Sequence, residues 1–308
     1  MAASSNVESD RFVATLSADA QWPLQRLASA VTPVVDVGIT LARTVRRGRA
    51  TELARLGHQW NALGRRDALG AVLTRPWTAP EWDVADFFET GRADVERLMR
   101  AIARRAPRLT TRRALDFGCG VGRLTQALAS HFTAVQGVDV AASMIARARL
   151  ENPTPARCHF VVNRRPHLRR FKTGTFDLVY SRLVLQHMPP SLVRRYIPEL
   201  VRVLAPGGLL VFQLPAVISD PRRSFCEAPV RGRFKRALPR RMVQAYRGLK
   251  YPLCQPPPSG MDMFGMARDT VVELVEGAGG RIFVTTSDDS HGTRAPGFEY
   301  WVTRSTAA

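Results

Sequence analysis

One loop of the sequence has residue types that suit the binding of a small ligand. Gly118, Gly120 and Gly122 lie between an apolar run and an amphipathic run, and glycine lets the backbone approach a ligand more closely than any side chain would allow. Asp116 lies two positions before the first glycine, where its carboxylate would repel a pyrophosphate and attract a cation. Arg123 stands where the dinucleotide pattern G-x-G-x-x-G needs its third glycine. The loop therefore favours a cationic ligand over a dinucleotide. The simpler alternative to ligand binding is that the glycines only form a tight turn between the strand and the helix.

A second carboxylate lies at the end of the next predicted strand. Asp139 follows Asp116 by 23 positions, and an acidic side chain at that strand end can accept hydrogen bonds from both hydroxyls of a ribose. The two carboxylates together indicate a ligand that combines a ribose with positive charge. S-adenosylmethionine, which carries an ammonium and a sulfonium group, fits that description, and NAD fits it less well.

The elements that must position these carboxylates alternate between short apolar runs and amphipathic stretches from residue 113 onward. Strands are predicted over residues 114–117, 134–139, 159–163, 176–180, 209–214, 281–286 and 298–303. Helices are predicted over residues 123–130, 143–150, 191–204 and 269–277. This alternation predicts a parallel sheet covered on both faces, with a ligand crevice at the carboxyl ends of the strands. The last two strands are joined by a loop without a helix, so they should run antiparallel.

Five short motifs follow one another along the chain. They are Leu115 to Thr125, Gly137 to Val140 with Met144, Phe176 to Tyr180, Leu185 to Pro189, and Leu204 to Gly208. In order and spacing these motifs resemble those of class I S-adenosylmethionine-dependent methyltransferases, above all the bacterial domains of the small-molecule type. Agreement among five ordered motifs is more specific than any one of them. The resemblance covers residues 114–215 and weakens through the closing strands.

The resemblance implies a set of cofactor-binding residues. Asp116 and the glycine backbone should hold the methionine part of S-adenosylmethionine, and Asp139 should hold the ribose. Val140 and Met144 should lie against the adenine. The full set that the resemblance implies comprises Asp116, Phe117, Gly118, Cys119, Gly120, Gly122, Arg123, Asp139, Val140, Met144, Asn163 and Ser181.

The resemblance also implies where the methyl acceptor binds. Ser181, Gln186 and His187 follow the fourth strand, beside the position expected for the transferring methyl group. Gln186 and His187 are the predicted acceptor-binding residues, and His187 is the candidate for a catalytic base. The alternative role of His187 is to cap or pack the following helix, because the same short motif recurs in relatives with different acceptors. Arg164 departs from the pattern, since relatives often carry an acid after the third strand, and Asn163 is the alternative contact for the adenine amino group.

The fold implied by the resemblance is α/β and Rossmann-like, with a seven-stranded, mostly parallel sheet whose last strand is antiparallel. Residues 113–308 should form this methyltransferase domain, with a substrate-lid insertion at about 215–266. Residues 51–112 show helical periodicity and should form a helical cap, and residues 1–50 should form an amino-terminal extension. The implied reaction is direct displacement of the cofactor's methyl group by an oxygen or nitrogen of a small metabolite, in which positioning of the reactants supplies most of the catalysis.

The chain is strongly basic. It has 45 Lys and Arg residues against 26 Asp and Glu residues, for a formal net charge of +19, and 42 of the basic residues are arginine. Such a surplus is typical of proteins that bind an anionic partner, but a genome rich in G and C produces the same surplus at tolerant surface sites. A basic run in the predicted lid could grip an anionic group of the acceptor or remain solvated, and it includes Arg222, Arg223, Arg231, Arg233, Arg240 and Arg241.

Two other classes of function stay open. An RNA-modifying methyltransferase would account for the net charge, but Tyr180, Ser181 and Arg182 stand where base-methylating enzymes carry an Asn/Asp-Pro-Pro-Tyr/Phe motif, which disfavours nucleic acid as the partner. A non-catalytic scaffold that binds nucleotide-like ligands is the other class, and the intact carboxylates and glycines argue against it.

A metal site and a transmembrane segment are not expected. The six histidines and four cysteines show no metal-ligand spacing, and scattered cysteines suit a reducing compartment. No apolar run of about 18 residues is present to span a bilayer, and we expect the protein to be cytoplasmic.

Overall fold

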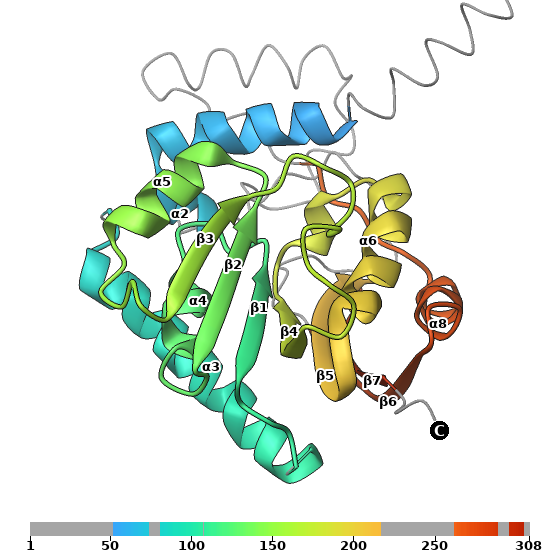
Figure 1. Cartoon of the computed structure of the whole chain (residues 1–308). Helices are drawn as coiled ribbons and strands as arrows, with labels where there is room; N and C mark the ends of the chain where they lie inside the picture. The colour runs from blue at the N-terminus through green and yellow to red at the C-terminus, as the bar shows by residue number, and fades with distance from the viewer. Residues whose placement is uncertain (1–51, 74–80, 107, 217–261, 289–295, 305–308) are drawn as a thin grey trace, which may run out of the picture. The chain divides into compact units, whose positions relative to one another are not determined.

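Seven strands form one mixed sheet in the computed structural model of the chain (Figure 1). The structure describes residues 52–73, 81–106, 108–216, 262–288 and 296–304. The strand order is β3-β2-β1-β4-β5-β7-β6. Strands β1 to β5 run parallel, and β7 runs antiparallel to both β5 and β6. The predicted α/β fold, with a mostly parallel sheet and an antiparallel last strand, is confirmed.

The elements agree closely with those predicted. The strands are β1 Arg113–Phe117, β2 Ala134–Asp139, β3 Cys158–Val162, β4 Phe176–Ser181, β5 Leu204–Pro215, β6 Gly280–Ser287 and β7 Gly297–Arg304. The helices are α2 Ala68–Val72, α3 Val84–Arg105, α4 Arg123–Leu128, α5 Ala142–Leu150, α6 Pro190–Val203 and α8 Arg268–Glu276, with a 3-10 turn, η2, over Leu185–His187. Residues 52–66 are also helical, and we call them the amino-terminal helix. Strand β5 differs most from its prediction because it begins at Leu204 rather than at residue 209.

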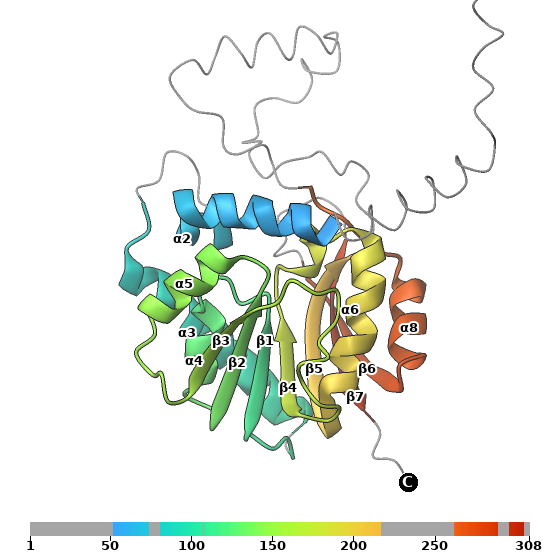
Figure 2. The same ribbon diagram turned by 45° about the horizontal axis from the view of Figure 1, so that its top comes forward.

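Alternate residues of the central strands face two separate apolar layers, because successive side chains of a strand point to opposite faces. On β1 and β4, Leu115 and Val179 pack in the layer that α6 and α8 cover. Ala114 and Leu178 pack in the layer that α3, α4 and α5 cover, and Figures 1 and 2 show how these helices are arranged around the sheet. Strand β4 is buried along its whole length, as expected for a central strand of a parallel sheet.

Helix α3 crosses α4 at close range, and this contact orients the helix that follows the glycine loop. Gly91 is buried at the crossing, where a Cβ atom would come within 2.4 Å of the backbone oxygen of Arg123. The Arg123 guanidinium donates to Asp94 Oδ2 at 2.7 Å and to Thr90 Oγ1 at 3.1 Å. The arginine is only 3% exposed, so this pairing joins the two helices from within.

The predicted division into domains falls only partly on the described residues. The extension over residues 1–50 and the arginines of the predicted lid lie outside them. Residues 51–112 as a separate helical cap remain a prediction, and the described part of that segment forms the amino-terminal helix, α2 and α3. None of the described helices has the length and apolar character needed to cross a membrane. Within the same residues, no group of three or more His, Cys, Asp or Glu side chains could hold a metal ion.

We expect Gly91→Ala to destabilise the protein. In an exposed helix this exchange stabilises by about 1 kcal/mol, because glycine is a poor helix former. Here the added methyl group would push α3 away from the Arg123 backbone, and overpacking costs about 1–3 kcal/mol. Chemical denaturation should therefore give a lower free energy of unfolding for the variant than for the wild type.

The control for this prediction is Ala93→Gly, at an exposed position of the same helix. It should lower the free energy of unfolding by about 1 kcal/mol through helix propensity alone. A Gly91→Ala protein at least as stable as the wild type would contradict the close crossing of α3 and α4.

Candidate active site

The glycine loop connects β1 to α4 at the carboxyl edge of the sheet (Figure 1). Gly118, Gly120 and Gly122 have φ angles of 81°, 53° and 85°, in the left-handed region that glycine adopts without strain. The amide of Gly118 donates to the Val138 carbonyl at 2.7 Å, which ties the loop to β2. A Cβ atom at position 118 would lie 2.3 Å from a methyl carbon of Val184. The loop therefore requires glycine both for its backbone conformation and for its close packing.

Asp116 is almost fully withdrawn from water beside this loop. The residue is 1% exposed, and its Oδ2 accepts a hydrogen bond from Thr125 Oγ1 at 2.6 Å. Burial raises the pKa of the carboxyl group to about 6, against the opposing effects of the Thr125 hydrogen bond and the Arg123 charge. The raised pKa means that the protein itself supplies too little positive charge to balance this carboxylate, and a cationic ligand would supply more.

Asp139 ends β2 and holds the glycine loop from the other side. Its Oδ2 accepts a hydrogen bond from the amide of Gly120 at 3.0 Å, and its Oδ1 accepts one from the amide of Ala141 at 2.8 Å. Burial raises the pKa of this carboxyl group as well, although hydrogen bonds from the backbone of Ala141, Gly120 and Val140 oppose the shift. The two carboxylates thus flank the glycine loop at the ends of neighbouring strands.

The amino-terminal helix lies across the carboxyl edge of the sheet (Figure 2). Asn61 Oδ1 accepts a hydrogen bond from the Ser143 amide at 2.9 Å, and Ser143 Oγ donates to the Asn61 carbonyl at 3.0 Å. A Cβ atom on Gly57 would lie 3.1 Å from Val140 Cγ2, and Met144 is 1% exposed. The amino-terminal helix therefore packs against Val140 and Met144, the two residues predicted to contact the adenine.

The segment after β4 has a strained backbone. Ser181 Oγ donates to the Phe117 carbonyl at 3.1 Å, which ties the end of β4 to the end of β1. Leu183 has a φ of 59° and is the only described residue other than glycine with a positive φ. Its amide donates to Gln213 Oε1 at 3.2 Å. A left-handed backbone costs a leucine about 1–2 kcal/mol, and residues held in such conformations cluster at functional sites.

His187 and Gln186 form a buried polar pair in η2. Their Nε2 atoms lie 3.2 Å apart, and the ring of Trp60, from the amino-terminal helix, meets the His187 ring edge-on with 5.4 Å between centroids. Burial lowers the pKa of His187 to about 4, with a smaller opposing effect from the backbone of Asp262. The imidazole is therefore neutral at neutral pH, and its low pKa makes it a weak base.

Two buried side-chain amides at this position each leave one polar atom without a partner among the described residues. Gln186 Oε1 and Gln213 Nε2 make no hydrogen bond with any described residue, and leaving a buried polar group unpaired costs about 1–3 kcal/mol. Gln213 was missed by the sequence analysis. Its signal was a single amide residue in the otherwise apolar run of residues 209–214.

Two predicted cofactor residues direct their side chains into the protein. The Arg123 guanidinium binds α3 through Asp94. Asn163 Nδ2 donates to the carbonyls of Arg165 and His167 at 3.1 and 3.2 Å, within its own loop. The structure therefore brings Asp116, Asp139 and the glycine loop together, whereas ligand contacts of the Arg123 and Asn163 side chains remain predictions.

Known proteins share this part of the sequence. Residues 115–212 match the family described as "Methyltransferase domain". The trans-aconitate 2-methyltransferase of Methylobacterium nodulans is 30% identical over 144 residues, which cover 46% of this chain and 52% of that protein. The enzyme of the same name from Rhodopseudomonas palustris strain BisB18 is 29% identical over 220 residues, which cover 66% of this chain and 82% of that protein. The chain thus spans about half the length of the first relative.

Solved structures share the fold. Magnesium protoporphyrin IX methyltransferase from Synechocystis, with bound SAH, has a TM-score of 0.52 at 16% identity and is matched over 82% of this chain and 99% of that one. A SAM-dependent methyltransferase from Leishmania major has a TM-score of 0.53 at 13% identity, over 82% of each chain. The family match, the shared sheet topology and the paired carboxylates at the glycine loop all agree. Residues 115–212 therefore match a methyltransferase domain, and the chain has the fold of the solved S-adenosylmethionine-dependent methyltransferases.

Proposed function

We propose that the protein binds S-adenosylmethionine at the carboxyl ends of β1 and β2 and transfers its methyl group to an oxygen or nitrogen of a small molecule. The observation that carries the proposal is the pair of carboxylates, the buried Asp116 and the half-buried Asp139, on either side of the glycine loop. A buried carboxylate that lacks compensating charge favours a cationic ligand, and a carboxylate at the end of β2 is suited to a ribose.

The residues of the site fit this cofactor. Asp116 would attract the ammonium group of the methionine part. Each oxygen of Asp139 accepts one amide hydrogen bond, and because an ionised carboxylate offers about four lone-pair positions, room remains for the two ribose hydroxyls. Val140 and Met144 offer apolar contact to the adenine. When bound, the cofactor supplies an electrophilic methyl group, and the protein's task is to position the acceptor in line with it.

The acceptor would bind beyond the end of β4. The unpaired Gln186 Oε1 is an acceptor and the unpaired Gln213 Nε2 is a donor, so together they could orient a hydroxyl or amino group. Trp60 and the amino-terminal helix would exclude water from this side. The name of the trans-aconitate 2-methyltransferase relatives supports small carboxylic acids as the first class of acceptor to test, ahead of RNA.

We expect Asp139→Ala to weaken the binding of S-adenosylhomocysteine by about ten- to a hundredfold, because losing a hydrogen bond to a charged group costs about 1.5–3 kcal/mol. Isothermal calorimetry on the full chain measures this affinity. Asp86→Ala, at an exposed position in the first turn of α3, is the control and should change the affinity less than about twofold. Unchanged binding by Asp139→Ala, or tight binding of NAD by the wild type, would contradict the proposed site.

The raised pKa of Asp116 predicts a specific dependence of stability on pH. Protonation of this carboxyl group is easier in the folded than in the unfolded protein, so its contribution to stability is fully present below about pH 4 and is lost as the pH rises through about 6. Asp116→Asn removes that loss. The stability of the variant relative to the wild type should therefore increase between pH 4 and 6, by up to about 3 kcal/mol, and stay constant above.

Denaturation of the ligand-free proteins at several pH values tests this prediction. Asp86→Asn, on exposed α3 surface, should show no such increase. If the difference between Asp116→Asn and the wild type does not depend on pH, the carboxylate is balanced within the protein and does not require a cation.

We expect His187→Gln to reduce the single-turnover rate by about tenfold, which is a little over 1 kcal/mol of barrier, and to leave S-adenosylhomocysteine affinity unchanged. An obligatory base would contribute about 10²–10⁴ in rate, and a histidine with a pKa of about 4 is too weak a base for that role at neutral pH. From about pH 6 to 9 a histidine with this pKa stays neutral. The rates of the wild type and the variant should therefore depend on pH in the same way over that range.

A panel of small di- and tricarboxylic acids provides the acceptor for this measurement, and His159→Gln, at an exposed position of β3, is the control. A thousandfold loss accompanied by the disappearance of a wild-type inflection would show that His187 is the base.

A further inference from the structure

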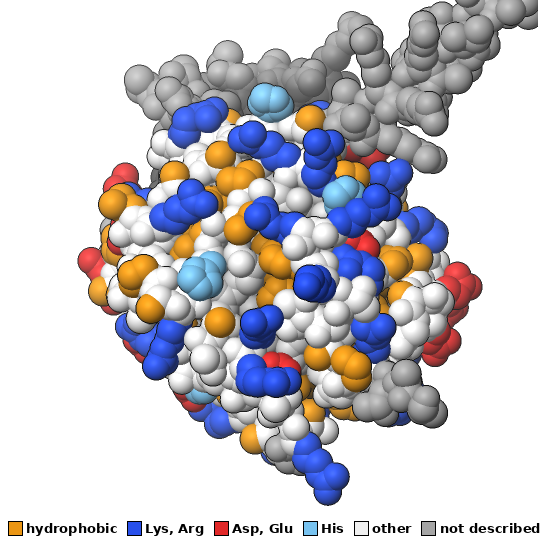
Figure 3. Space-filling model, in the orientation of Figure 1, with side chains coloured by type: hydrophobic (Ala, Val, Ile, Leu, Met, Phe, Trp, Pro, Cys, Tyr) orange, Lys and Arg blue, Asp and Glu red, His pale blue; other side chains and the backbone are white. Residues whose placement is uncertain are grey.

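The loop that joins β3 to β4 concentrates positive charge without compensating acids. No acidic residue occurs between Glu151 and Asp177, while six arginines and lysines do. None of the exposed cations of the loop forms an ion pair with a described residue, and these are Arg164, Arg165, Arg169, Arg170 and Lys172. Lys and Arg side chains outnumber acidic ones on the face of the molecule drawn in Figure 3.

Part of this loop lines an open cavity. Its volume is about 320 Å³, and it is lined by Val162, Asn163, Arg164, Arg165, His167 and Arg170. Three of the lining residues carry a guanidinium group, one carries an imidazole, and none is acidic. The volume falls in the range of small-ligand sites, about 300–1,000 Å³. A cavity of this size and charge suits an anion larger than a sulfate ion.

Hydrogen bonds within the loop fix the shape of the cavity wall. Asn163 Nδ2 donates to the carbonyls of Arg165 and His167 at 3.1 and 3.2 Å. The hydroxyl of Tyr196, on α6, donates to the same Arg165 carbonyl at 2.8 Å. The backbone that carries the cations is therefore held in one conformation, which reduces the entropy lost when a ligand binds.

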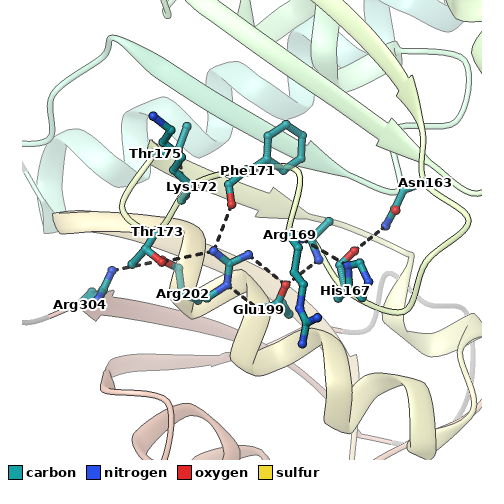
Figure 4. A network of polar contacts seen from close by, with 11 residues as sticks. Asn163, His167, Arg169, Phe171, Lys172, Thr173, Thr175, Glu199, Arg202 and Arg304 are labelled. Carbon is teal, nitrogen blue, oxygen red and sulfur yellow. Dashed lines mark hydrogen bonds and ion pairs between the residues drawn. The ribbon is translucent and has the colours of Figure 1, made fainter.

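Helix α6 anchors the rest of the loop (Figure 4). Glu199 Oε2 accepts a hydrogen bond from the Leu168 amide at 2.6 Å, and both oxygens of Glu199 accept from Arg202, at 2.7 and 3.0 Å. Arg202 also donates to the Phe171 carbonyl at 3.1 Å and to Thr173 Oγ1 at 3.3 Å. The hydrogen bond from Arg202 lowers the pKa of Glu199. The Glu199 carboxylate is thus committed to Arg202 and the Leu168 amide, and it forms no ion pair with the lining arginines.

The cavity is separate from the position proposed for methyl transfer, and it borders the predicted adenine site through Asn163, which is part of its lining. It lies at the end of β3, and two strands, β2 and β1, stand between β3 and β4. Ser181 and His187 come after β4. A molecule in the cavity would therefore not be the methyl acceptor.

We propose that this cavity binds a small soluble anion that carries a diphosphate or a phosphate ester. Guanidinium groups form paired hydrogen bonds with phosphate oxygens, and three arginines require a ligand with more than one negative charge. The lining includes one apolar residue, Val162, and the only exposed large hydrophobic residue of the described chain, Leu150, does not belong to it. A soluble ligand fits this composition better than a lipid headgroup in a membrane.

Titration of the full chain with inorganic pyrophosphate, without S-adenosylmethionine and at an ionic strength of about 0.15 M, tests the proposal. The wild type should bind pyrophosphate more tightly than sulfate. The double variant Arg165→Gln/Arg170→Gln should lose at least about tenfold in affinity, because each arginine donates charge-assisted hydrogen bonds. The control Arg92→Gln/Arg100→Gln removes the same charge from two exposed positions of α3 and should lose less than about twofold.

The alternatives give different results. Equal losses in both double variants would overturn the proposal, because net charge alone would then account for binding. Binding to phosphatidic acid vesicles without binding to pyrophosphate would overturn the assignment to a soluble ligand. The affinity of Arg165→Gln/Arg170→Gln for S-adenosylhomocysteine should stay within about twofold of the wild type, and a tenfold loss would show that the cavity belongs to the cofactor site. The pyrophosphate result does not depend on the proposed methyl transfer.

Discussion

The placement of the buried Asp116 beside the half-buried Asp139, at the ends of neighbouring strands, is the constraint on which the rest of the site depends. Asp116 and Asp139 both lose hydration, and the charge of Asp139 further raises the pKa of Asp116. The hydrogen bonds that the protein offers in return come from neutral donors, the Thr125 hydroxyl and the amides of Gly120 and Ala141, and the charge of Arg123 opposes the shift of Asp116 only in part. Such an arrangement lowers the stability of the ligand-free protein at neutral pH. Three features hold the two carboxylates in place: the glycine loop, the close crossing of α3 and α4, and the amino-terminal helix.

The glycine loop and its carboxylates could be predicted from the sequence because their roles depend on spacing within one β-α-β unit. The partners of long side chains could not. Arg123 reaches Asp94, 29 positions away on α3, and Asn163 turns its amide into its own loop, and tertiary packing decides both contacts. The early start of β5 has a similar cause, since Leu204 pairs with Phe176 of β4 although the Pro-Gly-Gly sequence that follows predicts a turn.

The distribution of charge is more informative than the net value of +19. On α3, Arg92 lies beside Glu89 and Arg100 beside Glu96, one helical turn away, so these arginines are balanced locally and are typical of a solvated helix. The cations of the β3–β4 loop have no acidic neighbours on their own segment. The positive charge is therefore balanced locally on α3 and left unbalanced in the β3–β4 loop, so a single explanation does not cover all the arginines of the chain.

The amino-terminal helix touches both halves of the site at once. Through Asn61 it is bonded to Ser143 on the cofactor side. Through Trp60 it contacts His187, and Glu52 accepts a hydrogen bond from Ser191 at 2.5 Å on the acceptor side. A helix moves as a stiff body, so lifting it from one half also lifts it from the other. Under the proposed function, exchange of the demethylated cofactor and departure of the methylated product would then share a single opening event, and the rate at which these few contacts break would set an upper limit on the turnover rate.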